Sequence, residues 1–203
     1  MSAETKKMAF FDFDYTLAKT TECVRVWSPR GTREYFGKPY KLLTPSEFNA
    51  LNLAEDESIN EDSFIEFQKV NYKRATQIKS VFMFLNFFLK EEETIIKVLS
   101  ARPQVAEATV FKFLQKNLDY KKKIDSIEFK GCKSSDHRIK YDYIVSNTDC
   151  SNIGEVYVFD DNKKLIDHIA VNYLANFQNR KIITCFVEHN NNLESLHFKF
   201  LQC

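Results

Sequence analysis

Phe10-Phe11-Asp12-Phe13-Asp14-Tyr15-Thr16-Leu17-Ala18 joins a short apolar run to two carboxylates that stand one residue apart. An almost continuous apolar run that ends at Phe11 is typical of a strand in a parallel sheet, buried on both faces. Asp12 and Asp14 are not expected inside such a strand, because an unpaired buried carboxylate is costly. We therefore expect both acids where the strand ends, at the edge where open α/β sheets bind ligands.

Two acids and the hydroxyl of Thr16 at that edge suit a hard divalent cation, which prefers oxygen ligands. The same residues also fit ordinary turn chemistry, because aspartate favours turns and helix caps. The two interpretations differ in what should follow along the chain. A ligand site requires further polar residues at the ends of later strands.

The composition indicates one sizeable domain with a real core. The chain has 203 residues, of which 44% are hydrophobic and 28% charged, and 19 are phenylalanine. Only four glycines and four prolines argue against long flexible linkers. The formal net charge of +1 shows no overall basic excess, so any binding of nucleic acid must be local.

The cysteines and the apolar runs indicate a cytoplasmic protein. Five cysteines are scattered without a Cys-x-x-Cys pair, which fits free thiols in a reducing compartment and neither a disulfide framework nor a zinc site. No secretory signal is recognised near the first residues. The longest apolar stretch, 81–89, is interrupted by Asn86 and is too short to span a membrane.

Strand-like and helix-like segments alternate after residue 60, which predicts a parallel sheet with helices on both faces. After the first strand, further strands are expected at 94–99, 124–129, 155–159 and 181–187. Helices are expected at 60–74, 76–90, 103–118, 138–145 and 165–177. Residues 188–203 receive no assignment. The segment 20–75 is predicted to be a small, irregular insertion with a short strand at 24–27 and a short helix at 45–51.

Polar residues follow these expected strands and so should meet at one edge of the sheet. Besides the first pair, they are Ser100 after the second strand, Lys140 at a helix start, and Asp160 with Asp161 after the fourth strand. Clustered carboxylates repel unless a cation lies among them, and Mg²⁺ suits carboxylates, waters and phosphate oxygens. A hydroxyl and an ammonium supply donors for a phosphate group. The set predicts a phosphoryl-transfer site with an aspartate as nucleophile.

With these motifs in this order, from Phe10 to Val187, the chain resembles the haloacid dehalogenase (HAD) superfamily, whose members are mostly phosphatases. The resemblance implies a three-layer Rossmann-like α/β fold with strand order 5-4-1-2-3. It also implies roles for individual residues: Asp12 as nucleophile and Mg²⁺ ligand, Asp14 as acid/base with its carbonyl on the metal, Thr16 as the residue that orders the loop, Ser100, Ala101 and Lys140 as substrate contacts, and Asp160 and Asp161 around the metal.

Several roles stay open at this point. Lys130 and Lys133 compete with Lys140 for the phosphate-binding role, but we prefer Lys140, and place the other two on a solvated loop. Tyr15 stands where many members of the superfamily have glycine. Arg102 is expected either to reach the substrate or to form a salt bridge.

The substrate is expected to be a phosphomonoester, with a nucleotide or a nucleic-acid end as one candidate. An open site under a small insertion would admit an extended substrate, and aromatic and basic residues of the insertion are of the kinds that bind single strands: Arg25, Trp27, Arg30, Arg33 and Tyr35. The alternative for this cluster is an ordinary flap that packs on itself. The Asp14-Tyr15-Thr16-Leu17 loop, followed by an irregular insertion with a tryptophan, also resembles, more weakly, HAD domains linked to RNA-end repair.

The alternative to an enzyme is a binding module that keeps the fold and the metal but recognises nucleic acid or protein through residues 20–60. The complete set of acids argues against it. A dehalogenase does not need Asp14, and a phosphomutase usually has a substantial cap, so both are disfavoured. Oligomeric state and pathway are not predicted from these residues.

Overall fold

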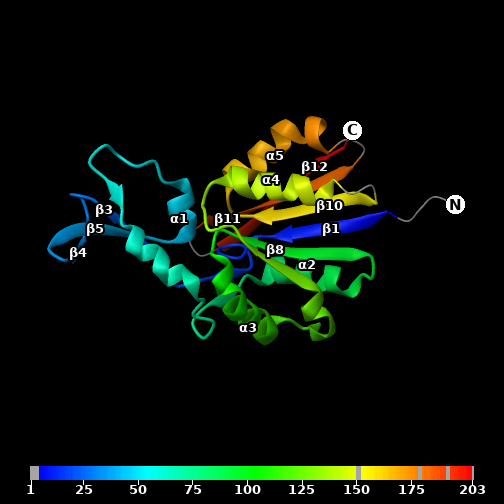
Figure 1. Ribbon diagram of the computed structural model, residues 1–203, viewed down its shortest axis with the longest axis horizontal. Helices are drawn as coiled ribbons and strands as arrows, with labels where there is room; N and C mark the ends of the chain where they lie inside the picture. The colour runs from blue at the N-terminus through cyan, green and yellow to red at the C-terminus, as the bar shows by residue number, and fades with distance from the viewer. Residues whose placement is uncertain (1–4, 150–151, 178–179, 191–192, 203) are drawn as a thin grey trace.

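A computed structural model describes residues 5–149, 152–177, 180–190 and 193–202 of the chain. It shows a mixed α/β protein whose main sheet has six strands in the order β12-β11-β10-β1-β8-β9 (Figure 1). Five strands are parallel and β12 alone runs antiparallel to its neighbour. The strands are β1 (Lys6–Phe11), β8 (Thr94–Ser100), β9 (Ile127–Gly131), β10 (Ile153–Asp160), β11 (Lys181–Asn190) and β12 (Leu193–Leu201).

Helices cover both faces of this sheet. On one face lie α2 (Lys79–Lys90) and α3 (Glu107–Asn117), and on the other lie α4 (His137–Thr148) and α5 (Lys163–Asn176) (Figure 1). Successive side chains of β1 point alternately into the two helical layers. Because both faces of the strand are buried, its apolar run in the sequence is continuous. Phe11, for example, stacks on Phe159 with ring centroids 4.6 Å apart.

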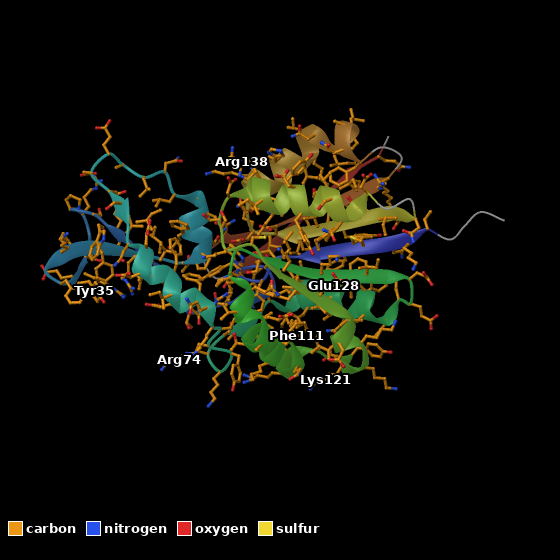
Figure 2. The ribbon with its side chains drawn as sticks, in the orientation of Figure 1. Tyr35, Arg74, Phe111, Lys121, Glu128 and Arg138 are labelled. Carbon is orange, nitrogen blue, oxygen red and sulfur yellow. The ribbon has the colours of Figure 1, made fainter. Side chains whose placement is uncertain are left out.

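The insertion leaves and rejoins the sheet edge through a short antiparallel pair, β2 (Ala18–Lys19) with β7 (Thr76–Gln77). Beyond this neck it forms a second sheet of four strands in the order β4-β5-β3-β6. Its elements are β3 (Val24–Trp27), β4 (Arg33–Tyr35), β5 (Lys38–Leu43), α1 (Pro45–Ala50), β6 (Ser58–Ile59) and the 3₁₀ helix η1 (Glu61–Gln68). It projects beyond the carboxyl ends of the parallel strands, and Tyr35 lies near its far tip (Figure 2).

The prediction of an irregular insertion is therefore wrong. The short strand at 24–27 was expected, but the other strands of this sheet show little alternation, and all three residues of β4 are exposed. The turn between β4 and β5 also lacks the usual Asn-Gly signal, since Phe36 and Gly37 occupy its left-handed positions, with φ of 50° and 70°. The helix expected at 45–51 is present, and begins with a capping box in which Thr44 and Glu47 bond reciprocally.

Other boundaries differ for local reasons. Helix α2 begins at Lys79 because Thr76 and Gln77 pair with β2, and the helix expected at 60–74 is the shorter η1. Residues 124–126 belong to the 3₁₀ helix η3 (Lys121–Ser126), so β9 starts at Ile127 and includes Lys130, which was expected in a loop. A further 3₁₀ turn, η2 (Gln104–Ala106), precedes α3. The unassigned tail forms the edge strand β12.

No helix in the described part of the chain is long and apolar enough to cross a membrane. Within the same residues, Cys23, Cys132 and Cys185 are free thiols, as expected, while Cys150 and Cys203 lie outside the described residues.

Candidate active site

The loop after β1 holds Asp12 and Asp14 in a tight, buried turn. The backbone N–H of Asp12 donates to Phe159 at 2.9 Å, which extends the β1–β10 pairing by one residue. The carbonyl of Phe13 then accepts from the N–H groups of Leu17 and Ala18, at 3.0 and 2.9 Å. These bonds fix the loop, so both acids lie at the end of the strand, as expected.

Tyr15 occupies the sharpest point of this loop, with a left-handed φ of 58°. That conformation is uncommon for a residue with a Cβ, so something must stabilise it. His189 of β11 does so, because its Nε2 lies 2.5 Å from the Tyr15 carbonyl oxygen and the two rings meet edge to face. Burial lowers the pKa of His189, which favours a neutral ring that donates from Nε2. The sequence alone did not point to this role of His189.

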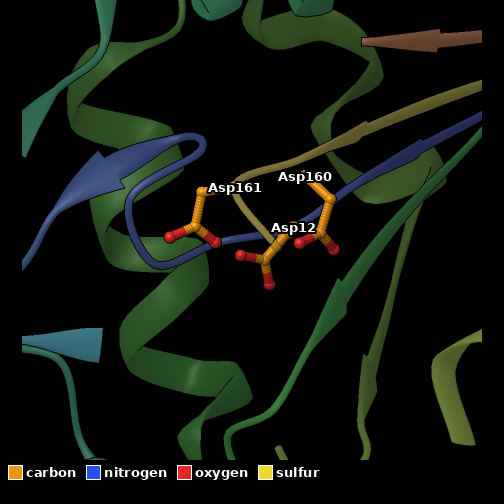
Figure 3. A group of neighbouring side chains, drawn as sticks. All are labelled: Asp12, Asp160 and Asp161. Carbon is orange, nitrogen blue, oxygen red and sulfur yellow. The ribbon is translucent and has the colours of Figure 1, made fainter. Parts of the chain in front are cut away.

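Asp12, Asp160 and Asp161 form a candidate metal centre at the ends of β1 and β10 (Figure 3). Each offers a carboxylate oxygen within 4.8 Å of the others, and all three residues are buried. Burial raises the pKa of Asp12 to about 7 although Lys140 lowers it, and burial and the neighbouring acids raise the pKa of Asp161 well above its usual range. A cation bound among these carboxylates would favour their charged forms and so lower both raised pKa values.

The fit to a cation rests on Asp161 in particular. Both of its carboxylate oxygens are buried, and neither has a hydrogen-bond partner of acceptable geometry among the described residues; the nearby Ser46 hydroxyl and Lys140 ammonium lower the pKa of Asp161 by less than burial raises it. Buried polar atoms of this kind are rare unless a water or an ion completes them. Three converging carboxylate oxygens suit Mg²⁺, which takes a few carboxylates and keeps waters or phosphate oxygens in its other positions.

Lys140 is the lysine that the fold brings to this centre. Its Nζ donates to Asp12 and to Asp160 at 2.8 Å each, from the first turn of α4, which Asp136 caps. Burial lowers the pKa of this amine, but the charges of the two aspartates outweigh burial, so the group stays an ammonium. Lys130 lies exposed on β9 instead of on a loop, and Lys133 lies exposed on the loop after it, as expected, where it also borders the cavity described below.

Thr16 and Ser100 support the loop and not the cavity surface. The Thr16 hydroxyl is buried and lies 3.5 Å from an oxygen of Asp12, to which it donates. The Ser100 hydroxyl, fully buried at the end of β8, accepts from the backbone N–H of Arg102 at 3.2 Å. Among the described residues that border the cavity, Ala101 is present and Ser100 is not, so a Ser100–phosphate contact stays a prediction.

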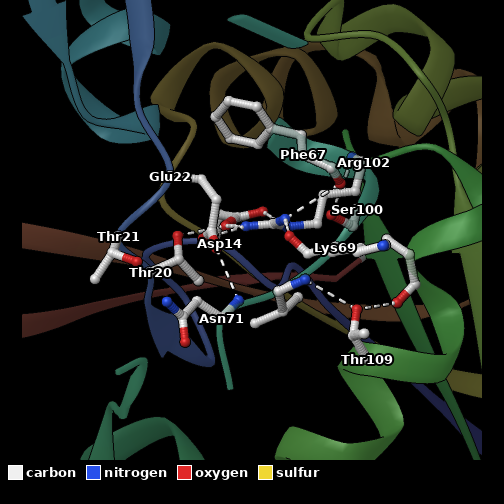
Figure 4. Close-up of polar contacts among 12 residues, drawn as sticks. Asp14, Thr20, Thr21, Glu22, Phe67, Lys69, Asn71, Ser100, Arg102 and Thr109 are labelled. Carbon is white, nitrogen blue, oxygen red and sulfur yellow. Dashed lines mark hydrogen bonds and ion pairs between the residues drawn. The ribbon is translucent and has the colours of Figure 1, made fainter. Parts of the chain in front are cut away.

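Arg102 makes the densest set of contacts at the site (Figure 4). Its Nε and Nη2 donate to the two oxygens of Asp14 at 2.8 and 2.7 Å, and Nη2 also donates to Glu22 at 3.0 Å. Its Nη1 donates to the carbonyls of Phe67 and Lys69 at 3.2 and 2.9 Å. The guanidinium thus links Asp14 to the two chain segments that enter and leave the insertion. Of the two roles expected for Arg102, the structure shows the salt bridge.

Asp14 has a third donor, because the Thr20 hydroxyl lies 2.6 Å from one of its oxygens. Asp14 is therefore a buried carboxylate with three donors that still borders the cavity, and its Oδ2 keeps one free acceptor site. The sequence identified Asp14, but Glu22 carried no signal of its own, since it lies 80 residues before Arg102.

A cavity of about 560 Å³ lies between this edge of the sheet and the insertion. The main domain contributes most of the charged residues that border it, among them Asp12, Asp14 and Lys140, and the insertion contributes residues of α1, β6 and η1. This volume is within the range of small-molecule sites. Of the candidate metal centre, Asp12 borders this space of ligand size, whereas Asp160 and Asp161 do not.

The aromatic and basic residues of the insertion mostly stack on, or form ion pairs with, other residues of the insertion. Trp27 stacks on Tyr35 with centroids 6.2 Å apart, Arg25 pairs with Glu66 at 2.7 Å, and Arg30 pairs with Asp56 at 2.7 Å. These contacts are those of a flap that packs on itself. None of the five cluster residues borders the cavity in the part of the chain that the structure describes.

Comparison with known proteins adds little to this description. No family model and no curated protein matches the chain. Among solved structures, a crystal structure of the Legionella pneumophila effector Ceg4 with an N-terminal TEV protease cleavage sequence aligns with a TM-score of 0.47 and 17% identity, over 91% of this chain and 87% of that one. Ceg4 with an N-terminal yeast Hog1p sequence gives 0.43 and 16%, over 91% and 88%. At these values the likeness carries no conclusion about function.

Proposed function

We propose that the protein is a magnesium-dependent phosphomonoester hydrolase that works through an aspartyl-phosphate intermediate on Asp12. The observation that carries the proposal is the set of three buried carboxylates, with the oxygens of Asp161 unpartnered and Lys140 bridging Asp12 and Asp160. Numbered in chain order, the parallel strands lie as 5-4-1-2-3, the order that the HAD resemblance implies, which supports a Rossmann-like HAD assignment.

In the first step of the proposed reaction, a carboxylate oxygen of Asp12 attacks phosphorus, and the bond from phosphorus to the alcohol oxygen breaks. The alcohol leaves with a proton supplied by Asp14. In the second step, water attacks phosphorus, Asp14 takes a proton from it, and inorganic phosphate and Asp12 are released. Lys140 orients the Asp12 carboxylate through its 2.8 Å hydrogen bond.

The metal would be held by Asp12, Asp160 and Asp161, and it would neutralise negative charge on the phosphoryl oxygens. Lys140 adds a positive charge beside the same oxygens. The free thiols of Cys23, Cys132 and Cys185 fit a reducing compartment, so the proposal includes a cytoplasmic location.

The test is phosphate release from a panel of phosphomonoesters with and without Mg²⁺, comparing the wild type with Asp12→Asn. The variant should keep its circular dichroism spectrum and lose at least about 1,000-fold in kcat, as expected when a nucleophile is removed. Acid quenching should trap a phosphorylated wild-type protein and none in Asp12→Asn. Full activity of this variant, or no magnesium-dependent release from any ester, would overturn the proposal.

A second readout tests the metal without catalysis. Asp161→Asn keeps the size of the side chain but removes the charge of a buried carboxylate whose oxygens lack hydrogen-bond partners among the described residues. We expect calorimetric titration with MgCl₂ to show at least about tenfold weaker binding, as for loss of a carboxylate ligand. Asp119→Asn, on the connection after α3, serves as the control and should bind Mg²⁺ like the wild type.

A further inference from the structure

The cavity has two chemically different sides. On the main-domain side stand the carboxylates of Asp12 and Asp14 and the ammonium of Lys140. On the insertion side the surface is mainly apolar, with aromatic rings from α1 and η1 and aliphatic side chains beside them: Phe48, Phe64, Phe67, Val24, Ile59 and Ile65. We call these six residues the apolar wall.

The apolar wall is already formed without a ligand. Phe48 and Phe64 lie with ring centroids 6.0 Å apart, and Phe64 and Phe67 with centroids 6.4 Å apart. Arg102 fixes the position of Phe67, because it donates a hydrogen bond to the Phe67 carbonyl and its guanidinium carbon lies 5.1 Å from the centre of the ring. A preformed surface of this kind binds with little loss of side-chain entropy.

Parts of the same wall remain open to solvent. Phe64 is 40% exposed and Ile65 is 62% exposed, although both border the cavity. Contiguous apolar surface beside polar groups is the usual character of a ligand pocket, in which apolar walls supply affinity and a few polar groups fix orientation. Here the polar groups are those of the proposed phosphoryl site.

We propose that the substrate is a phosphomonoester whose leaving group is a compact apolar moiety, about the size of one aromatic ring, which packs against the apolar wall. The inference rests on the proposed function, because the phosphoryl group must lie at Asp12 for the rest of the molecule to reach the wall. It narrows the substrate class of that same site to small organic esters.

The charges on the insertion side argue against a nucleic-acid end. Glu61 borders the cavity there, and no lysine or arginine of the insertion does so within the residues that the structure describes. Lys133 is a cation at the cavity border, but it belongs to the loop after β9 on the opposite side. A chain of phosphates needs an array of cations, which this wall does not offer.

The experiment compares two esters that differ in apolar size but leave alcohols of nearly equal acidity, benzyl phosphate and methyl phosphate. Burial of one face of a phenyl ring, on the order of 75 Å², should favour the benzyl ester by about 20-fold in kcat/KM. Binding of benzylphosphonate and methylphosphonate in the presence of Mg²⁺, measured by calorimetry, should show the same preference without any turnover.

Two variants locate the preference on the wall. Phe64→Ala should lower kcat/KM for benzyl phosphate about fivefold and leave methyl phosphate unchanged, because it removes part of the ring contact. Ile65→Ser tests the same wall at a more exposed position, in case Phe64→Ala destabilises the insertion. Phe36→Ala is the matched control, since Phe36 is 87% exposed on the insertion and does not border the cavity.

The outcomes separate the inference from the proposed function. Equal kcat/KM for the two esters, equal binding of the two phosphonates, or a preference for a 3′-phosphorylated oligonucleotide would overturn the inference and leave a phosphatase. Wall variants that affect both esters equally would overturn it as well. No phosphate release from any ester, with benzylphosphonate still bound more tightly than methylphosphonate, would overturn the proposed reaction and keep the wall as a ligand site.

Discussion

Replacing Arg102 with methionine should destabilise the protein more than the loss of one ordinary surface arginine. The Arg102 side chain is fully buried, and its five guanidinium hydrogen bonds join Asp14, Glu22 and the carbonyls of Phe67 and Lys69. Methionine keeps much of the length and the apolar contacts of arginine but removes the charge and every donor.

The magnitude follows from what the change leaves behind. Asp14 and Glu22 are themselves only 7% exposed, so both carboxylates would remain buried without their main charge partner. Breaking a buried ion pair in this way costs about 3–5 kcal/mol. A domain of this size is stable by only about 5–15 kcal/mol, so the variant should lose about a fifth or more of its free energy of unfolding.

The assay is urea unfolding at pH 7 followed by far-ultraviolet circular dichroism. Arg138→Met is the matched control, because Arg138 also forms a two-pronged pair with a carboxylate, that of Asp136, but its side chain is 70% exposed. Solvent screens such pairs, so the control should unfold at nearly the wild-type urea concentration. Adding Glu22→Gln to Arg102→Met should recover part of the loss, since it removes one orphaned charge.

An Arg102→Met variant within about 1 kcal/mol of the wild type, or no less stable than Arg138→Met, would refute this account, because it would show that the buried carboxylates find other partners.

Two further predictions concern the insertion and the loop beside Arg102. Hydrogen bonds from Lys41 and from neighbouring groups lower the pKa of Glu57 to about 2, so its stabilising effect is complete above the unfolded value near 4.5 and is lost as pH falls toward 2. Fluorescence of Trp27, in the small sheet of the insertion, should report this acid transition. Glu57→Gln should weaken the insertion at pH 7 and flatten the pH dependence, whereas an unchanged acid transition in this variant would contradict the prediction. Gly131→Ala would place a Cβ 2.5 Å from the backbone nitrogen of Gln104, so urea unfolding should show a loss of about 1–3 kcal/mol, and wild-type stability would contradict the expected clash.

The main sheet could be predicted because burial on both faces leaves continuous apolar runs in the sequence. β1, β8, β10 and β11 each lie over or close to an expected strand, and their common direction brings residues as distant as Asp12 and Lys140 to 2.8 Å. That convergence needs no knowledge of side-chain contacts, since strand ends in a parallel sheet share an edge.

The insertion and the partners of Asp14 could not be predicted in the same way. The strand β3 alternates and was expected, but β4, β5 and β6 are short or partly exposed and show little of the alternation that marks a strand. Glu22 and Arg102 meet only because the neck of the insertion passes over the end of β8, and nothing in the sequence near either residue indicates this.

The same contacts connect the proposed chemistry with the position of the insertion. Arg102 and Thr20 together donate twice to Oδ1 of Asp14, and Arg102 donates once to Oδ2, so a proton that Asp14 carries while these bonds hold must sit on the remaining lone pair of Oδ2. Arg102 is also the donor that holds the carbonyls of Phe67 and Lys69, which join η1 to the neck. Proton transfer by Asp14 and the anchoring of the apolar wall therefore depend on one guanidinium group. A change in the hydrogen bonds of Asp14 should therefore alter the position of the wall, and a displacement of the wall should alter the hydrogen bonds of Asp14.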